Sequence, residues 1–210
     1  ILFINYASES LKRAEQLRLT NDFLRNQRIA DLTLQSLKEK SFPLLISDRK
    51  EHLDLLQELI ARRVATEMLP IEILRLDGDI GVKQRRIVLE KITTFRAESK
   101  IVLLMSTGSL VGEGFDLPEL DTLVLATPLS FEGRMVQYAG RIHRLVEGKT
   151  KVQIIDFVDS YSAMLIKMYR NRVDAYRKMG YTINDSSSMF ASVGRRKRSH
   201  VSSTLGFQFQ

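Results

Sequence analysis

The sequence predicts an α/β domain built on a parallel β-sheet that helices cover on both faces. The short runs with strand character are apolar along their whole length, as in strands that are buried on both sides. Segments with apolar residues at helical spacing separate these runs, and such alternation is typical of parallel sheets. The predicted strands are 43–47, 71–76, 101–105, 122–126 and 152–157.

The first strand is expected to lie between helical segments. Residues 9–40 are rich in charge and carry apolar residues at helical spacing, which predicts one or two amphipathic helices, with Asn21 or Asp22 capping the second. The run 43–47 is bounded by proline and aspartate and reads as a buried strand. The segment 50–64 follows as a helix because its apolar residues fall on one face.

The remaining elements alternate in the same way. The strand 71–76 ends at Asp77, Gly78 and Asp79, where acidic turn residues are a better explanation than a metal site. The other expected helices are 82–95, 133–145 and 160–179. After residue 180 the sequence is typical of a loose tail. The basic run at 195–198 could be a nuclear-address signal or a nucleic-acid patch, although a solvated tail is the more common explanation for such a run.

Composition limits the classes of function. The chain has 210 residues, of which 44% are hydrophobic, and this is typical of a globular protein. It contains no cysteine, which excludes disulfides and cysteine-based metal sites, and its three histidines are scattered. No apolar run reaches the roughly 18 residues of a membrane span. The net charge of +7 is compatible with nucleic acid, although the run 195–198 supplies four of the positive charges.

In parallel sheets, ligands bind at the carboxyl ends of the strands, so the loops that begin there are the first candidates for a site. The loop 106–118 contains three glycines and three hydroxyl side chains, which suit a backbone that approaches phosphate oxygens. Asp116 could accept a hydrogen bond from a ribose or pair with an arginine. A plain glycine-rich turn capped by Asp116 remains an equal alternative. The chain has neither a GxxxxGK[ST] phosphate loop nor a dinucleotide fingerprint.

A second candidate is the segment 137–144. On a helix, Gln137, Arg141 and Arg144 share a face. Two guanidinium groups on one face fit an anion with several oxygens, such as a phosphoryl group in transfer. For a bare pair of arginines, a solvated basic face is the more common explanation. His143 is interpreted as a neighbour of the two arginines and not as a general base. His52 is interpreted as a surface residue of its helix.

Together, these loops resemble the C-terminal RecA-like domain of superfamily 2 helicases and translocases. Residues 43–49 look like motif IV, and 76–85 resemble motif IVa. Residues 106–118 look like motif V, which ends in glycine-hydrophobic-aspartate-hydrophobic-proline, and 137–144 match the motif VI pattern QxxGRxxR. The resemblance covers about residues 43–160 and is nearest the branch of type III restriction subunits and XPB- or RadD-like helicases.

The resemblance implies a RecA-like fold of the P-loop NTPase type, with an N-terminal helical connector and a C-terminal tail. Its expected divisions are 1–40 for the interdomain connector and the helices that follow it, 41–180 for the RecA-like domain, and 181–210 for a basic tail that can be flexible. In this family ATP and Mg²⁺ lie between two such domains and are held mainly by the first domain. The Walker A and B motifs are absent here, so the chain is expected to be inactive alone and to be the carboxyl-terminal portion of a longer ATPase.

The resemblance also assigns roles to individual residues. Arg141 and Arg144 would be arginine fingers for ATP hydrolysis. Residues facing ATP would be Gly114, Asp116, Gln137 and Gly140. Residues contacting nucleic acid would be Ser47, Asp48, Arg49, Gly78, Ser106, Thr107, Gly108 and Ser109. No metal ligand is expected in this chain.

The expected partners are nucleic acid, with DNA favoured over RNA, and the N-terminal RecA-like domain of the same polypeptide, with no membrane. A cytoplasmic protein is expected in a bacterial or phage context, and a nuclear one in a eukaryote. Two alternatives stay open. One is a catalytically inactive helicase-like module that binds nucleic acid or protein. The other is an unrelated doubly wound domain for a small phosphorylated ligand.

Overall fold

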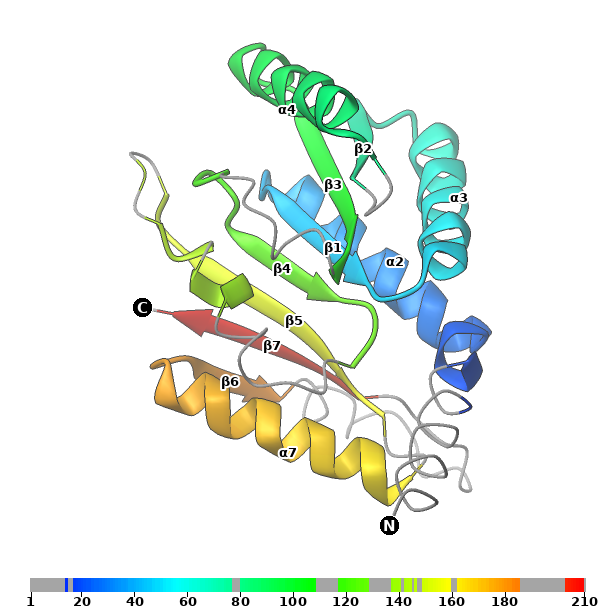
Figure 1. The fold of residues 1–210 in the computed structure, drawn as a ribbon, viewed down its shortest axis with the longest axis vertical. Coiled ribbons are helices and arrows are strands. Elements are labelled where there is room, and N and C mark those ends of the chain that lie inside the picture. The colour runs from blue at the N-terminus through cyan, green and yellow to red at the C-terminus, as the bar shows by residue number, and fades with distance from the viewer. Residues whose placement is uncertain are drawn as a thin grey trace.

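The architecture is a seven-stranded sheet with the order β2-β3-β1-β4-β5-β7-β6 (Figure 1). The computed structural model describes residues 14, 17–76, 80–108, 117–128, 137–140, 142–144, 146, 149–159, 162–185 and 203–209. The first five strands are parallel, which confirms the predicted sheet. They are β1 (Pro43–Ser47), β2 (Ile71–Leu76), β3 (Ile101–Thr107), β4 (Thr122–Leu125) and β5 (Val152–Val158).

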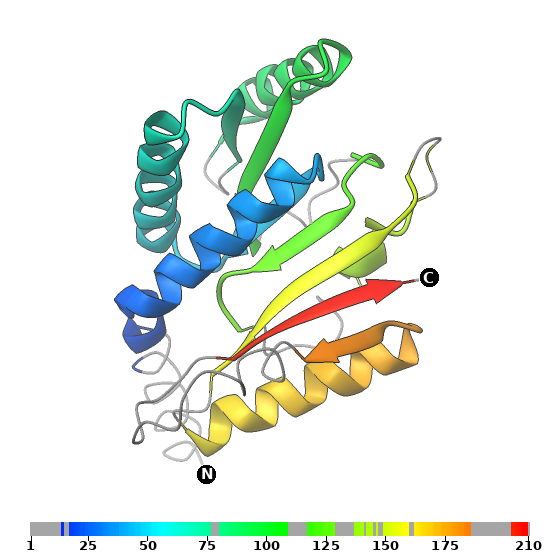
Figure 2. The same ribbon diagram turned by 180° about the vertical axis from the view of Figure 1, so that it is seen from behind.

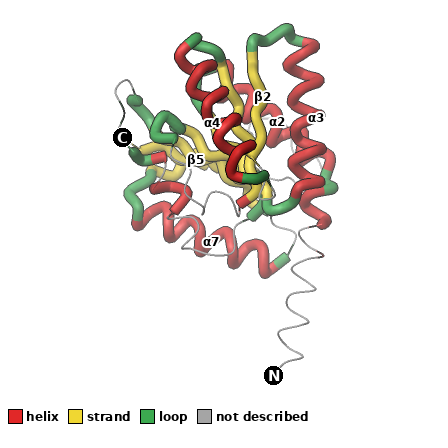
Figure 3. The backbone as a smooth tube through the Cα atoms, turned by 45° about the horizontal axis from the view of Figure 1, so that its top comes forward, coloured by secondary structure: helices red, strands yellow, loops and turns green. Residues whose placement is uncertain are grey.

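Helices cover both faces of this sheet, as predicted. The helices α2 (Phe23–Lys38) and α3 (Lys50–Thr66) share a buried cluster with Leu45 of β1, and Figure 2 shows α2 lying across this face. The helices α4 (Val82–Ala97) and α7 (Ala163–Lys178) pack on the other face. At the sheet edge, β2 contacts both α3 and α4 (Figure 3). Because the central strands are buried on both sides, their sequences read as continuous apolar runs.

Four helices end in the same way before the chain turns into a strand. The residue after the C-cap has a positive φ in each case, and the next N–H donates to a carbonyl of the last helical turn. Glycine adopts this conformation without strain, but only one of the four turns uses it. The four residues are Lys40 (φ 62°), Met68 (φ 50°), Ser99 (φ 59°) and Gly180 (φ 84°).

Two strands lie in the segment 181–210, where the sequence predicts a tail and no strands. They are β6 (Thr182–Asp185) and β7 (Ser203–Phe209). The strand β7 pairs antiparallel with β5, and β6 pairs antiparallel with β7. They extend the sheet at the β5 side, so the parallel strand β5 is an inner strand of a mixed sheet.

A buried ion pair fixes α7 to β5. The guanidinium of Arg172 donates to both carboxylate oxygens of Asp156, with Nε–Oδ2 at 2.7 Å and Nη2–Oδ1 at 3.1 Å. The hydroxyl of Tyr176 also donates to Asp156, at 2.9 Å. Burial raises the pKa of the Tyr176 phenol, and the Asp156 carboxylate raises it further. The phenol therefore stays protonated and keeps its donor role.

A second buried ion pair attaches α2 to the sheet. Arg25, in the first turn of α2, donates from Nε and Nη2 to the two carboxylate oxygens of Asp159, at 2.8 and 3.1 Å. Its Nη1 donates to the carbonyl of Ala126 at 2.5 Å, just past β4. Arg25 and Asp159 are almost fully buried. The first turn of α2 is thereby held at the carboxyl ends of β4 and β5. The N-cap is Asp22, as the sequence predicted, and it accepts from the Arg25 N–H.

Within the described ranges, none of the helices combines the length and the apolar character that a membrane crossing requires.

Candidate functional site

The loops that follow β1 and β3 meet the segment 137–144 around Gly108. The hydroxyl of Tyr138 donates to the Gly108 carbonyl at 2.6 Å. A Cβ atom on Gly108 would lie 2.9 Å from the Tyr138 hydroxyl and closer still to Oδ1 of Asp48. The Asp48 N–H in turn donates to Oγ1 of Thr127, after β4, at 3.0 Å. Segments that are about 30 and 80 residues apart in sequence thus converge at this edge, and any side chain at position 108 would force the Asp48 carboxylate and the Tyr138 hydroxyl to shift.

The segment 137–144 has one buried and one exposed side. Tyr138, Ala139 and Ile142 belong to the core, whereas Gln137, Gly140 and Arg144 are exposed. The N–H of His143 donates to the Ala139 carbonyl at 3.0 Å, so the segment is helical in its hydrogen bonding. Gln137 and Arg144 therefore lie on the solvent side of the element. The Tyr138 hydroxyl reaches the loop after β3, whereas the Arg144 carbonyl shares the Lys149 ammonium with Pro118, which precedes β4.

The predicted nucleic-acid residues divide into exposed and buried groups. Asp48 is exposed and Arg49 is half-buried, so both are accessible to a ligand. Ser47, Ser106, Thr107 and Gly108 are buried, and the Ser106 hydroxyl donates to the Thr107 carbonyl at 3.1 Å. The predicted residues Gly78, Ser109, Gly114, Asp116 and Arg141, together with Asp77 and Asp79, lie outside the described residues.

His52 is buried, with 2% exposure, so the prediction of a surface residue is wrong. Its Nδ1 lies 2.9 Å from the Ser47 hydroxyl and its Nε2 lies 2.9 Å from Oδ1 of Asn26. Since the Asn26 amide nitrogen donates to the Thr20 carbonyl at 2.8 Å, its oxygen accepts from Nε2–H. Nδ1 is then the acceptor of the Ser47 hydroxyl proton.

This network shapes the loop after β1. The Ser47 oxygen, held by His52, accepts the N–H of Arg49 at 3.3 Å. His52 therefore acts on the loop through Ser47, and the Ser47 hydroxyl already has partners inside the protein. Burial lowers the pKa of His52 to about 3, with further lowering from the charges of Arg25 and Arg49. The imidazole is neutral at neutral pH.

We expect His52 to make stability pH-dependent. The histidine pKa of 6.5 in the unfolded chain falls to about 3 on folding. The unfolded state therefore binds the proton more readily, and stability is lost as pH falls from about 6.5 towards 3. The loss reaches about 5 kcal/mol at the low end, at about 1.4 kcal/mol for each pH unit. Urea unfolding at a series of pH values, with His52→Gln as comparison, measures it.

The difference between the two proteins isolates the imidazole, because carboxylates that titrate in the same range are common to both. The free energy of unfolding of His52→Gln should approach that of the wild type as pH falls. Parallel pH profiles for the two proteins would show that His52 does not titrate in this way.

His143 is engaged with the C-terminal end of α7. Its ring meets the Tyr181 ring edge-on, with centroids 5.1 Å apart, and its Nε2 hydrogen-bonds the Tyr181 hydroxyl. Burial lowers the pKa of His143, and the nearby Lys149 charge lowers it further. Lys149 also donates to the carbonyls of Pro118 and Arg144, at 2.9 and 3.1 Å. These contacts fix the backbone at Arg144.

Positive potential gathers at the same edge of the sheet. The helices α3 and α4 begin at Lys50 and Val82, and neither N-cap residue, Arg49 or Gly81, makes a side-chain capping hydrogen bond. Free N–H groups at the start of a helix favour anions. The Nε of Arg49, the N-cap residue of α3, is buried without a hydrogen-bond partner among the described residues. An anionic ligand at this edge could accept hydrogen bonds from these N–H groups.

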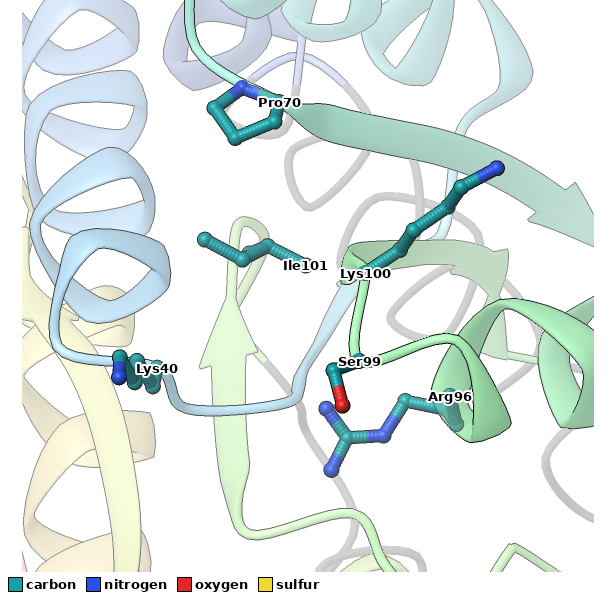
Figure 4. Close-up of a pocket in the computed structure, with 6 residues that line it drawn as sticks. All are labelled: Lys40, Pro70, Arg96, Ser99, Lys100 and Ile101. Carbon is teal, nitrogen blue, oxygen red and sulfur yellow. The ribbon is translucent and has the colours of Figure 1, made fainter.

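A pocket of about 520 Å³ lies at the opposite edge, near the amino ends of β1, β2 and β3 (Figure 4). Lys40, Arg96 and Lys100 line it. Lys100 pairs with Glu98 at 3.0 Å, and Arg96 lies 5.0 Å from the centre of the Phe42 ring. The helices α2 and α4 end here, so their carbonyl dipoles oppose an anion and the cations offset those dipoles. This pocket is therefore not the candidate site. In the described ranges, no group of three or more His, Asp or Glu residues could hold a metal.

Comparison with known proteins gives the family. Residues 24–146 match the model of the helicase conserved C-terminal domain. The chain belongs to this family. The match spans α2 to the segment 137–144, so it includes the buried Arg25 and every loop of the candidate site.

Similar proteins come from viruses and from DNA-processing systems. "Probable helicase D10" of Escherichia phage T5 is 28% identical over 138 residues, which are 66% of this chain and 28% of the phage protein. The matched part of this chain thus spans less than a third of the length of that relative. The structure of T4 UvsW has a TM-score of 0.62 at 16% identity and covers 79% of this chain and 35% of its own. The type ISP restriction-modification enzyme LlaBIII, solved bound to DNA, has a TM-score of 0.57 at 18% identity. This match covers 73% of this chain and 12% of the LlaBIII chain. These likenesses show the RecA-like fold.

Proposed function

We propose that this chain is the second motor domain of an ATP-dependent nucleic-acid helicase or translocase that acts on DNA. The observation that carries the proposal is the convergence at Gly108 of the loop after β1, the loop after β3 and the segment 137–144. It brings the segment that carries the exposed Gln137 and Arg144 into contact with the loops that follow β1 and β3. The family membership supports the same conclusion.

The segment 137–144 would face ATP. Gln137, Gly140 and Arg144 are exposed on it, and Arg141 lies between them in sequence. Guanidinium groups stabilise the charge on the equatorial oxygens of a phosphoryl group in transfer. Arg141 and Arg144 are therefore the proposed arginine fingers, and Gly114 and Asp116 are proposed to complete the ATP-facing surface from the loop after Gly108.

The loop edge beside β1 and β3 would contact nucleic acid. Asp48 and Arg49 are accessible there, and the N-terminus of α3, whose N-cap side chain makes no capping hydrogen bond, favours phosphate oxygens. Ser47, Ser106 and Thr107 are buried, so they would contribute through the backbone and through loop shape. Contacts to phosphate carry no base information, and binding would be sequence-tolerant and salt-dependent. The DNA in the LlaBIII structure is the reason to favour DNA.

The nucleotide itself would be held mainly by another domain. The sequence has no Walker A motif, so ATP and Mg²⁺ would be bound by an N-terminal RecA-like domain of the same polypeptide, with this domain closing the cleft. This chain alone would not hydrolyse ATP. The second candidate is a helicase-like module that binds nucleic acid or protein without turnover. The exposed Gln137 and Arg144 favour the motor, because a module without turnover requires neither.

The test uses the intact protein with both domains. We expect ATP hydrolysis that DNA stimulates, and DNA binding whose affinity falls linearly with salt on logarithmic axes. Arg49→Ala should reduce the magnitude of the salt slope by about one while affinity falls alike for all sequences. Arg62→Ala, in an exposed pair with Glu58 on α3, is the control.

Three outcomes separate the candidates. Binding without hydrolysis supports the module without turnover. Affinity that depends strongly on DNA sequence contradicts phosphate recognition. RNA of the same sequence, if it stimulates hydrolysis better than DNA does, overturns the choice of DNA and leaves the motor in place.

A further inference from the structure

The hydroxyl of Tyr138 bridges the two halves of the candidate site. Tyr138 is 1% exposed, so its ring is packed in the core, and its oxygen reaches the loop after β3. That oxygen donates to the Gly108 carbonyl at 2.6 Å, a bond made in a buried environment where hydrogen bonds are strong. The bond joins an element proposed to face ATP to one proposed to contact nucleic acid.

The two ends of this bond are next to functional positions. Tyr138 directly follows Gln137 in the ATP-facing segment. Gly108 ends the described part of the loop after β3, and Asp48 of the β1 loop lies against it. A displacement of the Gly108 backbone by a bound strand would be transmitted through the Tyr138 oxygen, because close-packed interiors leave the ring no free volume.

We propose that Tyr138 is a positioning residue through which bound nucleic acid raises the rate of ATP hydrolysis. This inference rests on the proposed function and adds a residue-level path between its two ligands. Tyr138 touches neither ligand and acts by setting the position of the segment 137–144 against the loops at Asp48 and Gly108. Its effect is a coupling between two sites, which is measured as the ratio of stimulated to basal turnover.

The experiment is Tyr138→Phe in the intact protein, which deletes one oxygen and keeps the ring. We expect the ratio of DNA-stimulated to basal kcat to fall by about fivefold or more, the range of typical couplings. Basal kcat and the Kd for DNA should stay within about twofold, since neither ligand is touched. The matched control is Tyr176→Phe. Tyr176 is also buried and its hydroxyl donates to Asp156, but it lies on α7, away from the loops at Asp48 and Gly108. Both variants should lower Tm by about 2–4 °C.

A second variant approaches the same contact from the other side. In Gly108→Ala the added methyl would lie under 3.0 Å from both the Tyr138 hydroxyl and the Asp48 carboxylate, so both must shift. It should lower the stimulation ratio in the same direction as Tyr138→Phe.

The outcomes distinguish this inference from the proposed function. A wild-type protein without ATP hydrolysis overturns the proposed function, and the coupling with it. If the wild type hydrolyses ATP and Tyr138→Phe keeps its stimulation ratio, only the inference about Tyr138 fails. If stimulated and basal turnover fall by the same factor, or Tyr176→Phe loses stimulation equally, the hydroxyl has a structural role alone.

Discussion

Replacing Arg144 by alanine in the intact protein should lower kcat for ATP by about 10³-fold or more and leave nucleotide binding within a few fold. The reason is that an arginine finger acts on charge that develops in the transition state, where its contribution is about 10³–10⁵ in rate. Arg144 is exposed, and Lys149 fixes its backbone carbonyl at 3.1 Å. The side chain can therefore extend from an anchored position. Steady-state ATP hydrolysis, with nucleotide affinity measured separately, tests this.

The chain offers two comparisons for that result. Arg144→Lys keeps the charge but loses the planar fork that matches phosphoryl oxygens, so it should recover little of the rate. Arg62→Ala removes an arginine whose only described ion pair is the exposed one with Glu58, and it should leave kcat unchanged. Wild-type turnover in Arg144→Ala would show that Arg144 is not a finger. A rise in KM alone, with kcat unchanged, would instead make it a binding residue.

The sequence predicted strands best where a strand is buried on both faces of the sheet. The strands β1 and β3 are apolar at nearly every position because helices cover both faces, whereas a strand with one solvated face alternates between apolar and polar residues. The strand β7, which lies between β5 and the edge strand β6, carries no such signal, since it follows a serine-rich and basic stretch and pairs antiparallel. Its place depends on β5, about 50 residues earlier, and local pattern does not report such pairing.

Buried polar residues were the hardest to predict from the sequence. His52 is followed at helical spacing by Leu56 and Ile60, both of which are fully buried. This spacing places it on the core face of α3, and the signal could have been read from the sequence. Arg25 precedes the buried Ile29 by four residues in the same way, but its partner is Asp159, 134 positions away. A local pattern can mark such an arginine as buried without showing what neutralises it.

In the candidate site, too, some features could be predicted from the sequence and others could not. The motif order indicated which loops would meet, because parallel strands place their carboxyl ends at one edge. The contact of Tyr138 with Gly108 was not predicted, since it depends on the depth at which one helix packs against the sheet. The burial of Ser47, which turns its hydroxyl towards His52, was missed for the same reason.

Replacing Arg25 by methionine should lower the free energy of unfolding by about 3–5 kcal/mol, because it leaves the Asp159 carboxylate buried without its partner. Arg25→Met/Asp159→Leu removes both charges and should recover most of the loss, with a coupling energy of at least about 2 kcal/mol. The Ala126 carbonyl loses its donor in both variants, so recovery stays incomplete. Urea unfolding of the two single variants, the double variant and the wild type measures the coupling.

The pH dependence of the free energy of unfolding gives an independent check on why Arg25→Met is destabilised. Burial raises the pKa of Asp159, and the Arg25 guanidinium opposes that rise, so Arg25→Met should raise this pKa further. A carboxyl whose pKa is higher in the folded than in the unfolded state stabilises the fold as pH falls through the folded value. The deficit of Arg25→Met relative to the double variant should therefore shrink in acid. His52, whose pKa the loss of Arg25 also raises, changes alike in both variants and cancels. A deficit that is independent of pH would mean that lost packing of α2, and not an uncompensated charge, destabilises the protein.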